Sequence, residues 1–190
     1  FASGKKQNKV WKKNVHYSVV TETEGIVTYA APIPVEGAVS ITLTPKGDKT
    51  EFFADDIAYF SKTSNQGYDG SLEMALIPDG FKVDVLGDKI DGGGALFEDA
   101  NAIPKNIALI FEFTGDKKAI RHLLYNVSVA RPNLESGTKN NGIDIKTETM
   151  NISAIPALDT GYVKAKAETS DTAYEGWFSA VYSYTAPVGG

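Results

Sequence analysis

The sequence has no cysteine and only two histidines among its 190 residues. Without cysteine the chain can form neither disulfide bonds nor thiolate metal sites. His16 and His122 lie more than a hundred residues apart, and neither falls in a metal-ligand or catalytic spacing pattern. We therefore expect no metal, no cofactor and no catalytic residue, and a structural or surface role for both histidines.

Long apolar runs and catalytic motifs are also missing. No apolar run approaches the roughly eighteen residues that a membrane-spanning helix needs, and the chain does not open with a secretory signal pattern. It contains no Gly-x-Ser-x-Gly elbow, P-loop or dinucleotide-binding fingerprint. Asp55 and Asp56 are adjacent, so on a strand they would point to opposite faces and could not act as an acid and base pair. These absences predict a protein that is not an enzyme and does not span a membrane.

Glycine is densest at residues 88–94, where Gly92, Gly93 and Gly94 follow two acids. A phosphate-binding loop would need Gly-Lys-Ser/Thr after the glycines, and a calcium loop would need regularly spaced acids and a closing Glu. Neither pattern is present. We expect a mobile surface loop here.

Positive charge is scarce outside the first thirteen residues. The chain has a net charge of −5, but residues 1–13 contain no acid, which leaves 14 basic against 24 acidic side chains in the remaining 177 residues. This segment could be a nucleic-acid tail, a solvated terminus, or a clamp on the next copy of the same acidic body. An acidic body argues against DNA binding, because phosphate contacts require Lys or Arg. The five lysines of this basic arm are Lys5, Lys6, Lys9, Lys12 and Lys13.

Apolar and polar residues alternate along several stretches, as in half-buried β-strands. In 71–77, Leu72, Met74 and Leu76 share one face, whereas in 102–114 apolar residues fall on both faces. Short helices are expected at 78–86, ending at Gly87, and from Ala173 onward. The sequence thus predicts a mainly β protein, an antiparallel β sandwich or partial barrel with one or two short helices. The other expected strands are residues 15–21 and 26–30, which form a hairpin, 38–44, 121–130, which forms a hairpin with 102–114, and 161–168.

Turn chemistry marks three breaks between these strands. Pro32 and Pro34 are expected to interrupt the ladder, and residues 45–49 and 65–70 are rich in turn-forming residues. Between the last two lies an aromatic cluster that we expect to close one end of the sandwich. Its members are Phe52, Phe53, Tyr59 and Phe60.

In the stretch 144–154, one face of β-favouring residues is polar from Thr147 to Ser153. Two interpretations remain open: a solvent-facing strand of a one-sided antiparallel sheet, and a strand that lines a channel. The candidate channel-lining residues are Thr147, Glu148, Thr149 and Asn151.

Several segments resemble the major tail proteins, or tail tube proteins, of long-tailed phages and prophages of Gram-positive bacteria. The strongest is FFADDIAYF at 52–60, followed by GYDGSLEMALIPDGFKVDVLG at 67–87. The resemblance spans most of the chain from about Asn14 to Tyr182, and it rests on order and extent because no segment is a catalytic motif. The other matching segments, in the order expected for the family, are 13–23, 108–116 with 121–126, and 146–150 with 159–161.

This resemblance implies a β-rich subunit that closes into hexameric rings, which stack into the tube that carries DNA from the capsid to the host. It divides the chain into the basic arm 1–13, a tail tube β domain 14–184 and a flexible tail 185–190. It implies a virion tail assembled in the host cytoplasm, with DNA passing through transiently and without sequence preference. The partners would be other copies of the chain, a tape-measure protein, a tail terminator and a distal tail protein. The candidate inter-subunit residues are the five arm lysines, Gly92, Gly93 and Gly94, and the 135–142 loop residues Lys139, Asn140 and Asn141.

A different class of function is a monomeric β-sandwich binding module for glycans or a host surface, since Trp11, Trp177 and nine tyrosines could stack on sugars. Within phage assembly, a tail terminator or sheath-like protein is the nearer alternative. A binding module stays monomeric at high concentration, whereas a tube protein forms rings or filaments.

Overall fold

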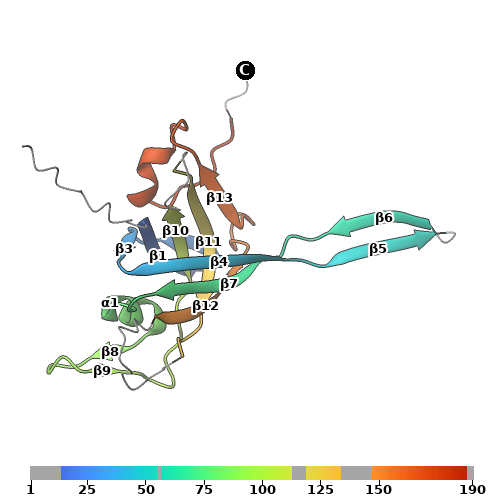
Figure 1. Ribbon diagram of the computed structural model, residues 1–190. Helices are drawn as coiled ribbons and strands as arrows, with labels where there is room; N and C mark the ends of the chain where they lie inside the picture. Colours follow the sequence, from blue (N-terminus) through green and yellow to red (C-terminus); the bar gives the residue numbers. More distant parts are fainter. Residues whose placement is uncertain (1–13, 55–56, 113–118, 134–146, 188–190) are drawn as a thin grey trace, which may run out of the picture.

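One large antiparallel sheet dominates the structure (Figure 1). The computed structural model describes residues 14–54, 57–112, 119–133 and 147–187, and for residues 49–63 the backbone alone. Seven strands follow the order β2-β1-β10-β11-β12-β7-β4, while β3 pairs with β1 and β13 with β11. The strands of this sheet are β1 (Asn14–Thr23), β2 (Ile26–Tyr29), β3 (Ile33–Val35), β4 (Ala38–Lys46), β7 (Gly67–Met74), β10 (Ile107–Glu112), β11 (Arg121–Val129), β12 (Glu148–Ile155) and β13 (Lys164–Ala167).

The sheet curls into a partial barrel that does not close. Strand β3 leads into β4 within a few residues, and an apolar groove between β4 and the β1–β10 pair is lined by Val15, Ala38, Leu72 and Phe111. The interior contains a cluster of buried side chains from β1, β7, β10, β11 and β12. The prediction of a mainly β, antiparallel fold with few short helices is therefore confirmed.

A short helical segment covers the interior cluster. It consists of the α-helical turn α1 (Asp79–Phe81) and the wider π-helical turn η1 (Lys82–Leu86). Phe81 and Val85 lie one turn apart and are buried, and the Phe81 ring meets the Tyr17 ring edge-on at 4.9 Å. The turn ends at Gly87, whose φ of 79° is the left-handed conformation that favours glycine. The helix predicted at 78–86, with its stop at Gly87, is confirmed.

A second cluster lies on the opposite side of β10 and β11. The 3-10 turn η2 (Tyr174–Phe178) brings Tyr174 and Trp177 against Ile110 and Leu123. Because the two faces of β10 and β11 are covered by different segments, Ile107 to Phe111 are all buried. The apolar second face predicted from Ile110 is confirmed, and the apolar residues expected from Ala173 onward do pack on the sheet, although as a single 3-10 turn.

Both predicted hairpins are present. Strands β1 and β2 pair around the turn at Glu24 and Gly25, and β10 pairs with β11 from Ile107↔Val127 to Glu112↔Arg121. Strand β13 is shorter than the predicted 161–168. Pro34 does not break the ladder as expected. It lies opposite His16 in β3, a three-residue strand at the margin of the sheet, where a missing N–H is tolerated.

The two turns predicted at 45–49 and 65–70 are wrong. Pro45 and Lys46 continue β4, and Gly67 to Gly70 begin β7, so the two stretches lie side by side: Pro45 pairs with Tyr68, and Lys46 with Gly67. The glycines allow neighbouring strands to approach each other closely. A Cβ on Gly70 would lie 1.8 Å from the Thr42 backbone oxygen, which is too short for any side chain.

The long β4–β7 pairing continues into a separate two-stranded sheet. Strands β5 (Lys49–Ala54) and β6 (Ile57–Thr63) pair from Lys49↔Thr63 to Ala54↔Ile57 and extend away from the large sheet (Figure 1). The expected aromatic cluster therefore lies, by its backbone, on this hairpin instead of at the end of a sandwich. The side chains of residues 49–63 lie outside the description.

We expect Gly70→Ala to lower the free energy of unfolding by about 1–3 kcal/mol, because β4 must shift to admit the methyl group. Gly80 is a matched control: it lies in the helical turn, and a Cβ added to it would have no atom within 4 Å. Gly80→Ala should leave stability unchanged or raise it by up to about 1 kcal/mol. Urea unfolding of both variants checks this, and equal effects would contradict the close-approach explanation.

Candidate functional site

The most extensive polar surface is the outer face of β4, β7 and β12, which no segment of the described chain covers. Every second residue of these strands points outward, while Ile41, Leu72 and Met150 point into the core. We call this surface the polar face. Its members are Ser40, Thr42, Thr44 and Lys46 of β4, Asp69, Ser71 and Glu73 of β7, Thr149, Asn151 and Ser153 of β12, and Thr147 just before β12.

The strand register aligns these residues in rows across the sheet. Thr42 pairs with Ser71, which pairs in turn with Asn151. At one end of the face, the Glu73 carboxylate accepts hydrogen bonds from the Ser40 hydroxyl and the Thr147 hydroxyl, both at 2.7 Å. Such cross-strand pairs fix the side chains in place and stabilise the register.

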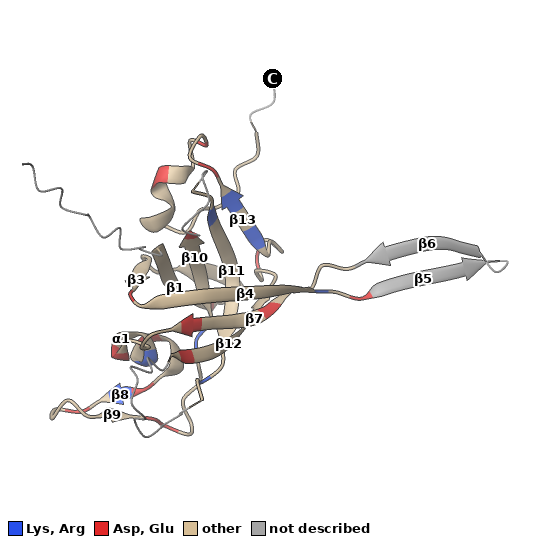
Figure 2. Ribbon diagram, viewed as in Figure 1, with Lys and Arg blue, Asp and Glu red and all other residues tan. Residues whose placement is uncertain are grey.

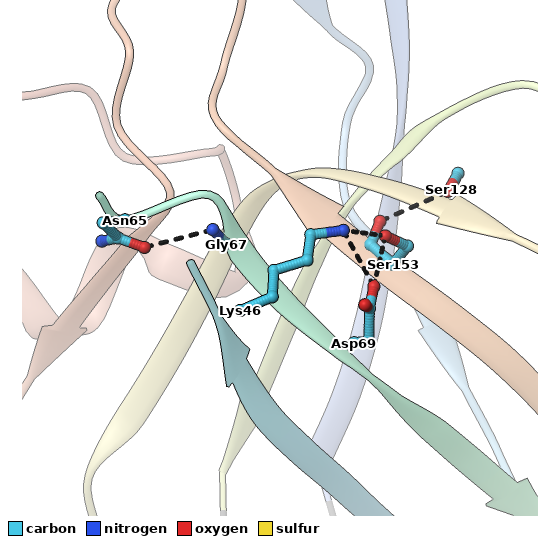
Figure 3. Close-up of polar contacts among 6 residues, drawn as sticks. All are labelled: Lys46, Asn65, Gly67, Asp69, Ser128 and Ser153. Atoms are coloured by element: carbon cyan, nitrogen blue, oxygen red, sulfur yellow. Dashed lines mark hydrogen bonds and ion pairs between the residues drawn. The ribbon is translucent and has the colours of Figure 1, made fainter. Parts of the chain in front are cut away.

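At the other end, Lys46 reaches across β7 to β12 (Figure 3). Its Nζ lies 2.8 Å from Asp69 Oδ1 and donates to Ser153 Oγ at 2.6 Å, and the Ser153 hydroxyl donates to Asp69 at 2.7 Å. These hydrogen bonds, from Lys46 first and from Ser153, hold the pKa of the Asp69 carboxyl below its usual value. The only cation of the polar face is thus already paired with an acid.

The charge of the polar face is therefore slightly negative. It carries the acids Asp69 and Glu73 against Lys46, with no arginine and no aromatic residue, and most of β4, β7 and β12 is uncharged (Figure 2). Serine, threonine and asparagine hydroxyls and amides dominate it. A surface of this kind binds water well and offers no free cation to a phosphate.

Three of the four candidate channel-lining residues lie on this face. Thr147, Thr149 and Asn151 are exposed and point outward together. Glu148 does not belong with them, because its side chain points to the other side, where Oε2 accepts a hydrogen bond from the Ile77 backbone N–H at 2.7 Å. Strand alternation explains this separation.

The polar face ends at strand β4, which has one unpaired edge. Within the described residues, β4 pairs only with β7, so its other edge has no strand partner along Ala38–Lys46. The outer edges of β2 and β13 are unpaired in the same sense. Unpaired edges favour pairing with another chain, and a soluble protein with several of them has to protect them or use them.

The glycine-rich segment forms a second projecting hairpin instead of an irregular loop. Strands β8 (Lys89–Ile90) and β9 (Leu96–Phe97) pair, and Gly92, Gly93 and Gly94 lie at the tip. The Asp91 carboxylate accepts hydrogen bonds from the backbone N–H groups of Gly93 and Ala95, at 2.9 and 2.8 Å. The Asp91 carboxylate therefore stabilises the turn at the tip of the hairpin.

Arg131, just after β11, contacts both strands' ends at the base of this hairpin. Its Nη1 lies 2.8 Å from Asp88 Oδ1, its Nη2 donates to the Leu86 carbonyl, and its Nε lies 3.4 Å from Glu98. Asp88 precedes β8 and Glu98 follows β9, so one guanidinium binds both ends. Asp88 is buried, which makes it dependent on this partner.

Arg131→Met is expected to lower the free energy of unfolding by about 2 kcal/mol, because the buried Asp88 carboxylate loses a charged hydrogen bond. Lys89→Met is the control, since the Lys89–Asp99 pair is exposed to solvent and should contribute little to stability. Thermal and urea unfolding measure both. Equal losses would show that the Arg131 contacts are not what holds the hairpin.

The remaining candidate residues from the sequence lie outside the described residues. These are the arm lysines Lys5, Lys6, Lys9, Lys12 and Lys13, the loop residues Lys139, Asn140 and Asn141, and the acids Asp55 and Asp56. Their proposed contacts stay predictions.

The histidines lie in the sheet. The His16 ring stacks on Phe178 at 4.3 Å, and burial, with the nearby Arg121 charge, lowers its pKa. His122 stacks on Phe111 at 5.3 Å. Across residues 14–187, apart from the undescribed gaps, no group of three or more His, Asp or Glu side chains is arranged to hold a metal ion, and no helix is long and apolar enough to cross a membrane.

The sequence indicated two parts of the polar face but did not predict that they lie on the same surface. The alternation of Ser40, Thr42 and Thr44 and the polar side of 144–154 were both visible. That they form one surface depends on β7 lying between β4 and β12, which no local pattern indicates. Asp69 was assigned to a turn, so its pairing with Lys46 was missed.

No protein-family model and no curated protein sequence matches the chain. Among solved structures, it is similar to the sheath/tube terminator of an extracellular contractile injection system, PVC, in the extended state. The identity is 14%, the alignment covers 83% of this chain and 94% of that chain, and the TM-score is 0.42.

Proposed function

We propose that this chain is a structural subunit of a phage tail or a tail-like particle, and that it assembles into rings stacked as a tube. The observation that carries the proposal is the part of the sheet formed by β4, β7 and β12: its outer face is polar and poor in free cations, its inner face packs on the buried core, and it ends at the unpaired outer edge of β4. The sequence resemblance to tail tube proteins supports the same assignment.

In a closed ring, the unpaired strand edges would pair with those of neighbouring subunits. When identical subunits associate head to tail around an axis, the edge of each sheet pairs with the next subunit until no edge is left. A long strand such as β4 supplies a row of backbone donors and acceptors for this contact. Six subunits per ring is the number that the family resemblance implies.

In the ring we place the polar face toward the bore. DNA moving through a tube should meet water and neutral or negative groups, because free lysines or arginines would bind its phosphates and slow it. Lys46 is held by Asp69 and Ser153 and so is not available to phosphate. The tube would then work as a conduit without any catalytic step.

Stacking of rings needs a second set of contacts. The β5–β6 hairpin and the β8–β9 hairpin both project from the large sheet (Figure 1), and the basic arm 1–13 adds charge opposite to that of the body. We propose these three segments as the axial contacts. A tape-measure protein, a tail terminator and a distal tail protein would be the partners at the ends and in the bore.

Light scattering over a concentration series, with negative-stain electron microscopy of the same samples, tests the proposal. Rings or hollow tubes support it. Single rings that never stack would instead indicate a terminator-like role. A monomer at every concentration contradicts self-assembly and points to the binding-module alternative.

A further inference from the structure

A pocket of about 280 Å³ lies apart from the polar face, where the 157–162 turn meets the C-terminal segment. Four tyrosines surround it: Tyr29 of β2, Tyr125 of β11, Tyr162 and Tyr184. Asp159 is the only charged residue of its lining, which Thr160 and Ser183 complete. We call it the tyrosine pocket.

The frame of the tyrosine pocket is preformed. The Tyr125 hydroxyl donates to the Tyr182 carbonyl at 2.8 Å, and the Tyr182 ring stacks on the buried Trp177. The 157–162 turn is closed by two backbone hydrogen bonds of 2.9 Å, from Ala157 N–H to the Tyr162 carbonyl and from Gly161 N–H to the Ala157 carbonyl. A ligand would therefore enter without a large ordering cost.

Its chemistry favours a cation. Asp159 and Tyr29 line the same pocket, and burial, followed by the Asp159 charge, raises the pKa of Tyr29. The Asp159 carboxylate accepts one hydrogen bond, from the Thr160 N–H at 2.8 Å, and no basic side chain of the described chain pairs with it. Aromatic faces, phenol oxygens and an unpaired carboxylate together suit an ammonium group, which has three donors and a full charge.

We propose that the tyrosine pocket binds a lysine ammonium from the basic arm, residues 1–13, of a second copy of the chain. This inference rests on the proposed self-assembly and identifies where the arm would bind. The arm has five lysines and no acid, whereas the rest of the chain carries a net charge of −10. Fully extended, thirteen residues span about 45 Å.

A glycan is the other ligand that tyrosines could bind, but the geometry favours it less. The Tyr162 and Tyr184 rings lie 5.3 Å apart and are tilted by 50°, so they do not present one flat platform for a sugar ring.

The test is a titration with a fluorescent peptide of residues 1–13, using as receptor the full chain with its own five arm lysines changed to glutamine. We expect saturable binding that weakens with added salt. Asp159→Asn and Tyr162→Ala should each weaken it by roughly three- to tenfold. Glu36→Gln, which removes an exposed charge elsewhere, should not change it.

Absence of peptide binding at low salt would overturn the proposal, as would equal affinity for the Asp159→Asn receptor. Displacement of the peptide by a neutral oligosaccharide would overturn it in favour of a glycan site. A peptide with its lysines replaced by glutamine should not bind. Because the titration does not depend on tube formation, its failure is distinguishable from failure of the assembly proposal, which microscopy of the wild-type chain reports separately.

Discussion

Replacing Trp177 by alanine is expected to lower the free energy of unfolding by about 3–5 kcal/mol. Trp177 is 1% exposed and lies in the cluster that covers the outer side of β10 and β11. Its ring also stacks on Tyr182 at 5.8 Å, and the Tyr182 carbonyl accepts the Tyr125 hydroxyl. The loss of one side chain would therefore leave a large cavity and loosen the C-terminal segment.

Trp177→Phe separates cavity formation from loss of the indole group. The indole N–H has no hydrogen-bond partner in the described structure, so phenylalanine should lose only part of the packing and much less stability than alanine. Urea unfolding followed by far-UV circular dichroism gives both values. A loss below about 1 kcal/mol for the alanine variant would contradict a closed second core.

Placing arginine on the polar face should convert an inert surface into a DNA-binding one. Thr42, Thr149 and Asn151 are exposed and lie on the β4 and β12 strands that flank β7, so their replacement by arginine adds three free cations without disturbing the core. We expect measurable DNA binding. If each arginine contacts one phosphate, the logarithm of the association constant should fall with the logarithm of the salt concentration with a slope of about −2.7 per subunit.

The matched control carries the same three arginines at Thr169, Ser170 and Thr172, which lie near η2, away from the polar face. In the assembled tube, the polar-face variant should retain DNA in the bore, while the control should bind it on the outside only. Fluorescence anisotropy with short duplexes and nuclease protection distinguish the two. Equal protection in both variants would contradict a polar face directed toward the bore.

Local patterns were sufficient to predict the short helical segment and the burial of β10. Phe81 and Val85 at helical spacing, with Gly87 after them, predicted the short helical segment, since periodicity and a left-handed stop are properties of the segment itself. The burial of both faces of β10 followed from Ile110 in the same way.

Local patterns failed where glycine and proline had a use other than turning the chain. Gly67 and Gly70 serve close approach to Ala154 and Thr42, and Pro45 lies in an edge strand. Sequence alone does not separate a turn glycine from a close-approach glycine, because the deciding neighbour comes from a distant strand. Leu76 shows the same limit: its strand ends at Met74, so it is 66% exposed instead of sharing the buried face.

The candidate site was only partly predictable, for a related reason. Alternation identified Thr147, Thr149 and Asn151 as outward residues, but strand order decides that β7 joins them to β4. The tyrosine pocket was not predicted at all, since Tyr29, Tyr125, Tyr162 and Tyr184 come from four separate parts of the sequence. Long-range pairing, not local propensity, assembles both surfaces.

Cryo-electron microscopy of the assemblies formed by the purified chain tests the central claim most directly. The account predicts hollow tubes of stacked rings in which β4, β7 and β12 line the bore with Thr149 and Asn151 facing it, and β4 pairs with a neighbouring subunit. Tubes with this face on the outside, or a chain that stays monomeric at every concentration, would contradict it.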